Sequence, residues 1–316
     1  DVCSSDLALD LGKVVAGDNQ EEICELELEL RQGDAAALLE LAAELAADLP
    51  LMPCDISKAE RGYRLFDPNS YEVDPPAQKL LAETPLDGAF AAIAWYLLGS
   101  SQRLAEQYRF NGHWRLLEDW LQHLQDLRTL LGSLGQAVPR ASSRELREAL
   151  DALLADWAPR IERGRDDETL RQQAPQLFRG ELDETRWGLF SLNASRWLLA
   201  KAWTESRNER GNRQGAAALG KWLLRSLAEE AQATPLARAH QHPELLPDQA
   251  PRLQRMLTWL RLARGVLDLP EADRLYGELA KLLELLRQPV DAERLAARAT
   301  QAHTVLTLKP WKALMK

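Results

Sequence analysis

Strict alternation of charged and apolar residues marks one segment near the start of the chain. Residues 23–30 are Ile-Cys-Glu-Leu-Glu-Leu-Glu-Leu, and a period of two is typical of a β-strand. On such a strand Glu25, Glu27 and Glu29 share one face, while Cys24 and the leucines share the other. Neighbouring carboxylates repel one another unless positive charge lies among them. The pattern therefore predicts either a divalent-cation site or ion pairs with lysines and arginines.

The segment before this strand completes a predicted hairpin, and the segment after it predicts two helices. An apolar stretch from residue 7 reaches the alternating strand through a turn at Ala16-Gly-Asp-Asn19. Residues 35–48 carry leucines on one helical face behind a capping Asp34. Ser57-Lys-Ala-Glu60 has the form of a capping box and opens a short helix. Because two or three strands are too few for a stable sheet, we expect further strands from outside these residues.

Beyond residue 77 the apolar pattern is helical throughout. Residues 67–77 are rich in proline and turn-forming residues, as in an interdomain linker. Eight amphipathic segments follow at residues 86–109, 113–134, 142–164, 183–206, 213–232, 248–266, 270–286 and 290–304. They predict an antiparallel helical bundle. We expect the core between its helices to hold Trp95, Trp114, Trp120, Trp187, Trp197, Trp222 and Trp259.

Composition narrows the class of protein. The chain has 316 residues and a formal net charge of −9, which argues against a general nucleic-acid partner. Cys3, Cys24 and Cys54 lack metal-ligand spacing and match a reducing compartment. No apolar run approaches the roughly 18 residues that span a bilayer, and the start of the chain lacks the pattern of a signal peptide. We therefore expect a soluble cytoplasmic protein that binds neither membrane nor nucleic acid.

Three sequence motifs resemble a known family. They are Ala8-Leu-Asp-Leu-Gly-Lys-Val-Val-Ala-Gly17, the alternating strand followed by Gly33-Asp34, and Ser57-Lys-Ala-Glu-Arg-Gly-Tyr63. Together they resemble the end of the CYTH domain in bacterial inorganic triphosphatases that also carry a CHAD domain. The helical remainder resembles CHAD in length, helix pattern and phrases such as Val138-Pro-Arg140. The resemblance implies an α+β chain in which residues 8–66 are the C-terminal part of an antiparallel CYTH β-barrel and residues 78–316 an all-α helical bundle.

The resemblance also implies an activity. Triphosphate tunnel metalloenzymes, the class it points to, split tripolyphosphate into pyrophosphate and phosphate with Mg²⁺ or Mn²⁺. The implied catalytic residues are Glu25 and Glu27, the metal ligands are Asp10, Glu25, Glu27 and Glu29, and the substrate contacts are Lys58 and Arg61. From pattern alone a solvated strand face is commoner for the glutamates, and a solvated helix end suits the two basic residues equally well. Thiamine triphosphatase and class IV adenylate cyclase activities, which the same fold serves, remain alternatives.

Two features predict that the sequence is a piece of a longer protein. Residues 1–7 are what a sequencing-adapter string encodes when it is translated in frame. The Glu-X-Glu-X-Lys motif, which the family carries at the start of the CYTH domain, does not occur in the chain. Because half of the metal site and most of the phosphate-binding residues would belong with that motif, we expect the chain alone to be inactive.

The helical part suggests a second class of function. CHAD resemblance implies a histidine and several arginines on early helices, which form a basic surface for polyphosphate. Arg128 keeps the last of these arginines, but Glu118 and Leu121 stand near two other motif positions. A further basic set at helical spacing consists of Arg252, Arg255, Arg261 and Arg264; a solvated helix face is its commoner explanation. A helical module that binds polyphosphate or recruits a partner is therefore the alternative function.

Overall fold

The computed structural model describes residues 4–68, 73, 79–182, 184–234, 236–239, 241–267, 269–287 and 291–308. Residues 1–3 and most of the predicted linker lie outside the described residues. The chain divides into two compact units, of which the first comprises Asp1–Ala77 and Ala91–Asn208 and the second Gln78–Phe90 and Glu209–Lys316. The helices up to Asn208 thus belong to the same unit as the N-terminal strands.

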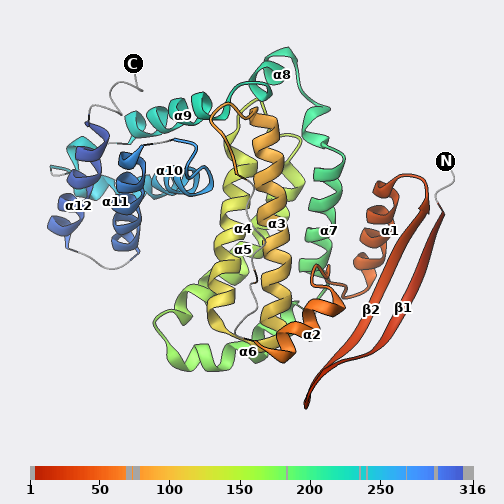
Figure 1. Ribbon diagram of the computed structural model, residues 1–316. Helices are drawn as coiled ribbons and strands as arrows, with labels where there is room; N and C mark the ends of the chain where they lie inside the picture. The colour runs from red at the N-terminus through yellow and green to blue at the C-terminus, as the bar shows by residue number, and fades with distance from the viewer. Residues whose placement is uncertain are drawn as a thin grey trace. The chain divides into compact units, whose positions relative to one another are not determined.

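A two-stranded antiparallel hairpin opens the first unit (Figure 1). Strand β1 (Ser4–Ala16) pairs with β2 (Asn19–Gln32) around a turn whose first central residue, Gly17, has a φ of 61°. Glycine adopts this left-handed conformation without a Cβ clash, as a type II′ turn requires. The register sets Asp10 opposite Glu25 and Leu9 opposite Leu26. The hairpin therefore has one acidic and one apolar face, as the alternation predicted.

Helix α1 (Ala35–Asp48) follows the hairpin and contacts β2 and α7. The Asp34 side chain accepts a hydrogen bond from the Ala36 amide at 2.9 Å, so the predicted cap is confirmed. The helix buries Ala43 and Ala46 against Leu192. Small side chains allow the close approach of two helices, which anchors the hairpin to the helical part of the first unit.

Helix α2 (Lys58–Phe66) contacts both strands from the acidic side. The predicted capping box is present, with Ser57 accepting from the Glu60 amide and Glu60 accepting from the Ser57 amide. Gly62 faces Val14 of β1, and a Cβ added there would lie 3.6 Å from it, in ordinary contact. The cap therefore places the next residue, Lys58, at the first turn over the hairpin.

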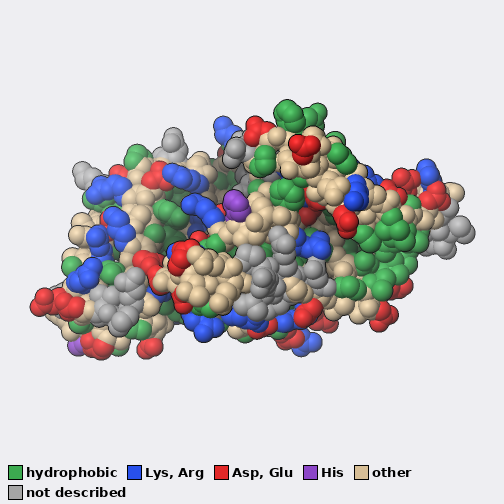
Figure 2. Space-filling model, turned by 90° about the horizontal axis from the view of Figure 1, so that it is seen from below, with side chains coloured by type: hydrophobic (Ala, Val, Ile, Leu, Met, Phe, Trp, Pro, Cys, Tyr) green, Lys and Arg blue, Asp and Glu red, His purple; other side chains and the backbone are tan. Residues whose placement is uncertain are grey.

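The apolar face of β1 remains open. Leu7, Leu9 and Leu11 are each more than half exposed, and Figure 2 shows hydrophobic side chains gathered at the hairpin end of the first unit. Within the part of the chain that the structure describes, β1 pairs with β2 alone. Contacts with α1 and α2 hold this small sheet in place.

The rest of the first unit is helical and is built around tryptophans. Its elements are α3 (Leu86–Asn111, of which residues 91–111 belong here), α4 (Trp114–Ser133), α5 (Arg144–Gly164), α6 (Glu168–Leu182), α7 (Thr185–Leu199) and the 3₁₀ turn η1 (Ala202–Thr204). The buried Trp120 ring lies 4.7 Å from that of Trp157 and 5.2 Å from that of Trp187. Of the tryptophans predicted for the core, Trp120 and Trp187 are buried here, while Trp114 and Trp197 are partly buried. Trp95 is an exception, because it falls on an exposed side of α3.

The second unit is smaller and also helical. Its elements are α8 (Glu209–Gly215), α9 (Leu219–Ala233), η2 (Leu236–Arg238), η3 (Pro243–Leu245), η4 (Pro247–Gln249), α10 (Ala250–Leu262), α11 (Pro270–Leu286) and α12 (Ala292–Leu306), together with the first turn of α3. Trp222 meets Trp259 edge to face at 4.6 Å, which gives this unit its own aromatic core. Across both units, none of the described helices is long and apolar enough to cross a membrane.

Candidate metal centre

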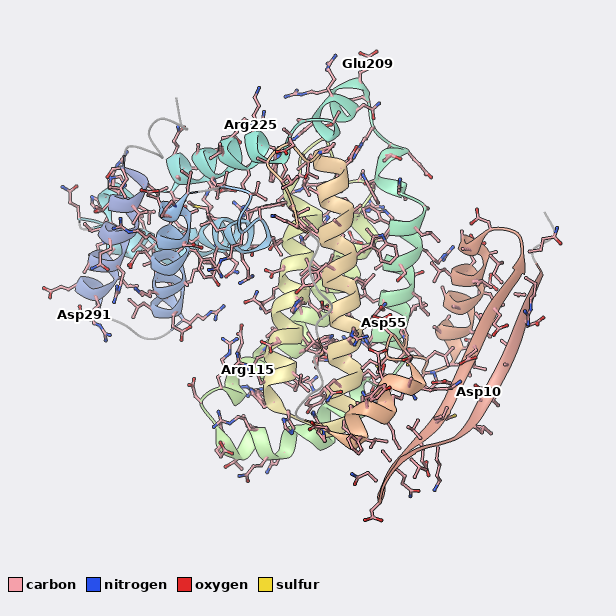
Figure 3. All side chains as sticks on the ribbon, in the orientation of Figure 1. Asp10, Asp55, Arg115, Glu209, Arg225 and Asp291 are labelled. Carbon is pink, nitrogen blue, oxygen red and sulfur yellow. The ribbon has the colours of Figure 1, made fainter. Side chains whose placement is uncertain are left out.

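Three carboxylates meet on the acidic face of the hairpin. A ligand oxygen from each of Asp10, Glu25 and Glu27 lies within 4.8 Å of the other two. The pairing register explains this meeting, because Asp10 lies opposite Glu25 and Glu27 is the next residue on the same face. Figure 3 labels Asp10 on the side of the hairpin that faces α2. Hard divalent cations prefer carboxylate oxygens, so the three residues fit such an ion.

The ammonium group of Lys58 lies among these carboxylates. Its Nζ is 2.7 Å from Glu27 Oε1 and 2.9 Å from Glu25 Oε1, and it also donates to Asp10. These hydrogen bonds, that to Asp10 first, raise the pKa of Lys58 above its usual value, so the amine stays charged at neutral pH. A Mg²⁺ ion at this place would draw its oxygens to about 2.0–2.1 Å. A bound cation would therefore displace the ammonium.

Glu29 lies apart from this group. Its carboxylate is 3.0 Å from Arg31 Nη2, and Arg31 Nε is 2.7 Å from Asp6. Four residues along a strand span about 13 Å, which carries Glu29 out of reach of a ligand set that contains Glu25. The structure thus brings together three of the four predicted metal ligands and places the fourth in an exposed ion pair.

Arg61 is buried behind Glu25. Its Nη2 donates to Glu25 Oε2 at 2.8 Å and to Cys54 Sγ, and its Nε is 3.4 Å from Glu106 Oε1 of α3. Because Glu25 Oε1 faces Lys58, the two oxygens of this carboxylate have separate cationic partners. Both predicted substrate contacts therefore touch Glu25, Lys58 at the edge of the cleft and Arg61 in the interior.

Arg64 and Glu106 extend the network, and no sequence motif indicated either of them. Arg64 is 1% exposed, lies 2.6 Å from Glu21 and 3.6 Å from Glu106, and stacks over the Phe110 ring at 4.3 Å. Burial raises the pKa of Glu106 above its usual value, against the opposing effects of the neighbouring thiol and guanidinium groups. The sole signal in the sequence was the spacing of three residues between Arg61 and Arg64, which sets both on one helix face.

Cys54 lies between Arg61 and Glu106. The thiol donates to Glu106 Oε2 at 3.3 Å and accepts from the Arg61 guanidinium. Although the residue is exposed overall, desolvation around its sulfur, together with the Glu106 charge, raises the pKa of the thiol to about 11. Cys54 is therefore a protonated hydrogen-bonding partner at neutral pH rather than a nucleophile.

The connected network carries more negative than positive charge. Five carboxylates, Asp10, Glu21, Glu25, Glu27 and Glu106, face three cations, Lys58, Arg61 and Arg64, so two negative charges remain when all eight are ionised. Six of these groups line a cleft of about 1250 Å³ between the hairpin, α1, α2 and α3. A divalent cation would balance this charge.

The basic residues predicted in the helical parts have different surroundings. In the first unit Arg128 forms a bidentate pair with Asp151 at 2.6 and 2.7 Å. Partial burial, and then the charges of Arg128 and Arg140, hold the pKa of Arg147 below its usual value, which marks a local concentration of positive charge. In the second unit Arg252 and Arg255 of α10 both pair with Glu230 of α9, and Arg264 pairs with Asp273.

Comparisons with known proteins give a partial likeness. No protein-family model matches the chain. Among solved structures, the chain is similar to the CHAD domain from the plant Ricinus communis, with 20% sequence identity and a TM-score of 0.43. The match covers 78% of this chain and 97% of that one. The structural neighbour is thus a CHAD domain, and the CYTH resemblance continues to rest on the sequence motifs.

Proposed function

We propose that the acidic face belongs to the catalytic site of a metal-dependent inorganic triphosphatase and that the hairpin is part of a CYTH barrel. The observation that carries this proposal is the meeting of Asp10, Glu25 and Glu27 within 4.8 Å, beside a cleft that Glu25 and Glu27 line and whose ion-pair network is negative. The sequence motifs supply the reaction, which is hydrolysis of tripolyphosphate to pyrophosphate and phosphate.

Each residue has a role that follows from its contacts. Asp10, Glu25 and Glu27 would hold Mg²⁺ or Mn²⁺, and the ion would neutralise phosphate oxygens and support the attack of water. With a cation among the carboxylates, the ammonium of Lys58 would move aside but remain charged at the edge of the cleft, where it would bind a phosphate oxygen. Glu27, with 43% of its side chain exposed, is the most open of the three carboxylates and is suited to orient a water molecule.

The first test is Mn²⁺ binding, measured from the electron paramagnetic resonance of the free ion. Lys58→Gln removes the ammonium that competes with the cation, so we expect Mn²⁺ to bind at least about tenfold more tightly than in the wild type. Lys13→Gln is the matched control, because Lys13 has the same charge on the same hairpin and bonds only to Gln20 in the described residues. Equal affinity in Lys58→Gln and wild type, or no binding in either, would contradict the proposal.

The second test is turnover. Because the Glu-X-Glu-X-Lys motif does not occur in the printed sequence, we expect this chain to bind Mn²⁺ yet release no phosphate from tripolyphosphate with Mg²⁺. In a protein that carries both the motif and this hairpin, Glu27→Gln should abolish phosphate release. Unchanged turnover in that variant would remove Glu27 from the catalytic residues.

The alternative function, polyphosphate binding by the helical part, is favoured by one observation. Arg128, Arg140 and Arg147 lie close enough for the charges of the first two to depress the pKa of the third, and such a concentration of guanidinium groups suits a polyanion. Arg147→Gln should then lower the salt concentration that elutes the chain from immobilised long-chain polyphosphate. Arg144→Gln, a neighbour whose side chain is exposed and weakly paired with Glu148, is the control.

A further inference from the structure

We propose that Glu106, on helix α3, is a positioning residue of the cation site: it holds Arg61, and through Arg61 it fixes the carboxylate of Glu25. The inference deepens the proposed function and rests on it. It makes the helical part of the first unit a component of the cation site rather than an independent module.

The burial of Arg61 makes a second negative partner necessary. The side chains of Arg61 and Glu106 are 9% and 8% exposed, and a buried charge without a counter-charge is strongly unfavourable. Glu25 cannot supply all of the compensation, since its other oxygen faces Lys58. In the described part of the chain, Glu106 is the remaining carboxylate that contacts the Arg61 guanidinium.

The planar guanidinium connects α3 to the site. Its donors have directions fixed by the plane of the group, unlike those of a lysine. Nη2 donates to Glu25 Oε2, and Nε lies 3.4 Å from Glu106 Oε1 in an ion pair without a hydrogen bond. Cys54 completes the link, because its thiol donates to the other oxygen of Glu106. Arg61 therefore holds one oxygen of Glu25 and leaves the other directed toward the cation position.

Loss of the Glu106 charge should weaken the binding of the cation. With glutamine at position 106, the positive charge of Arg61 is compensated by Glu25 alone, and Glu25 becomes a poorer ligand. We expect Glu106→Gln to weaken Mn²⁺ binding roughly fivefold. Glu106→Asp keeps the charge on a shorter side chain, and the Mn²⁺ affinity of this variant should lie between those of the wild type and Glu106→Gln. The double variant Arg61→Gln, Glu106→Gln removes both charges and should regain part of the lost affinity.

The experiment compares Mn²⁺ affinities of the wild type and these variants, with far-ultraviolet circular dichroism to confirm the fold at the temperature of the measurement. Glu118→Gln is the control, because Glu118 pairs with Arg165 outside this network. A purely structural role would lower the thermal unfolding temperature of Glu106→Gln and leave Mn²⁺ affinity of the folded protein unchanged, which would overturn the inference while the proposed function stands. Absence of Mn²⁺ binding to the wild type would overturn both. If Glu106→Gln does not fold, Glu106→Asp decides: reduced affinity supports the inference, and wild-type affinity overturns it.

Discussion

The acidic hairpin and helix α10 carry the same kind of sequence pattern but differ in the surroundings of their charges. Both place like charges at the spacing of their own secondary structure. On α10, Arg252 and Arg255 share the part-buried Glu230 of α9, while Arg264, just beyond the end of α10, pairs with Asp273 at an exposed surface. On the hairpin, the carboxylates of Asp10, Glu25 and Glu27 surround the ammonium of Lys58 at the edge of a cleft. The partners contributed by other elements, rather than the pattern itself, decide whether like charges become a site.

Removal of a buried cation should give the largest effect. Arg64→Met should lower the free energy of unfolding by about 3–5 kcal/mol, because Glu21 and Glu106 lose a counter-charge in a buried place. Just beyond α10, Arg264→Met should change the free energy of unfolding by only about 0–1 kcal/mol, since the side chains of Arg264 and Asp273 are 76% and 64% exposed. Urea denaturation measures both values. Similar losses of unfolding free energy in the two variants would show that the two regions do not differ in how strongly their cations stabilise the fold.

The hairpin network also protects a thiol, for which α10 has no counterpart. With Cys3 and Cys24 changed to serine, Cys54 is the one thiol left to react with iodoacetamide. Because its pKa is raised to about 11, we expect alkylation at pH 8 to be roughly a hundredfold slower than in the urea-unfolded chain. The rate should rise as the pH approaches that pKa. The same rate in both states at pH 8 would show that the network does not shield the sulfur.

Glu27 and Glu29 lie on the same strand, so a carboxylate of the proposed ligand set can be compared with one in an exposed ion pair. Glu27→Gln should weaken Mn²⁺ binding more than about tenfold, because it removes one of three anionic ligands. Glu29→Gln removes the same charge two residues away, from the pair with Arg31, and should change the affinity less than about twofold. Equal losses would indicate that overall charge, rather than a defined ligand set, attracts the ion.

The comparison of the two regions can also be tested on α10, by removing the carboxylate that its arginines share. Glu230→Gln frees Arg252 and Arg255 from their shared partner, so retention on immobilised polyphosphate should increase by a modest salt increment. Glu229→Gln makes the same change next to it, where the partner is Arg225 of the same helix, and should have a smaller effect. No difference between the variants would show that pairing on α10 does not limit its contact with polyanions.

The sequence predicts those parts of the fold that depend on local patterns. The alternating strand, the Asp34 cap and the Ser57 capping box were all predicted and are present. Helix α6 was not predicted, because Pro175 interrupts its pattern and apolar residues are sparse there. Glu106 could not be predicted from the sequence either. A single glutamate on a long helix belongs to no motif, and its contacts with Arg61 and Arg64 depend on the packing of α2.

The turn at Gly17 and Asp18 has a consequence that concerns parity. Successive strand residues point to opposite faces, so the register that starts at this two-residue turn decides which residues of β2 share a face with Asp10. With the turn kept at two residues, one residue inserted into β2 ahead of Cys24 would set Cys24 opposite Asp10, with no ligand replaced. The three carboxylates would then no longer meet. The number of residues between the turn and Glu25 is therefore as much a part of the cation site as any of its oxygens.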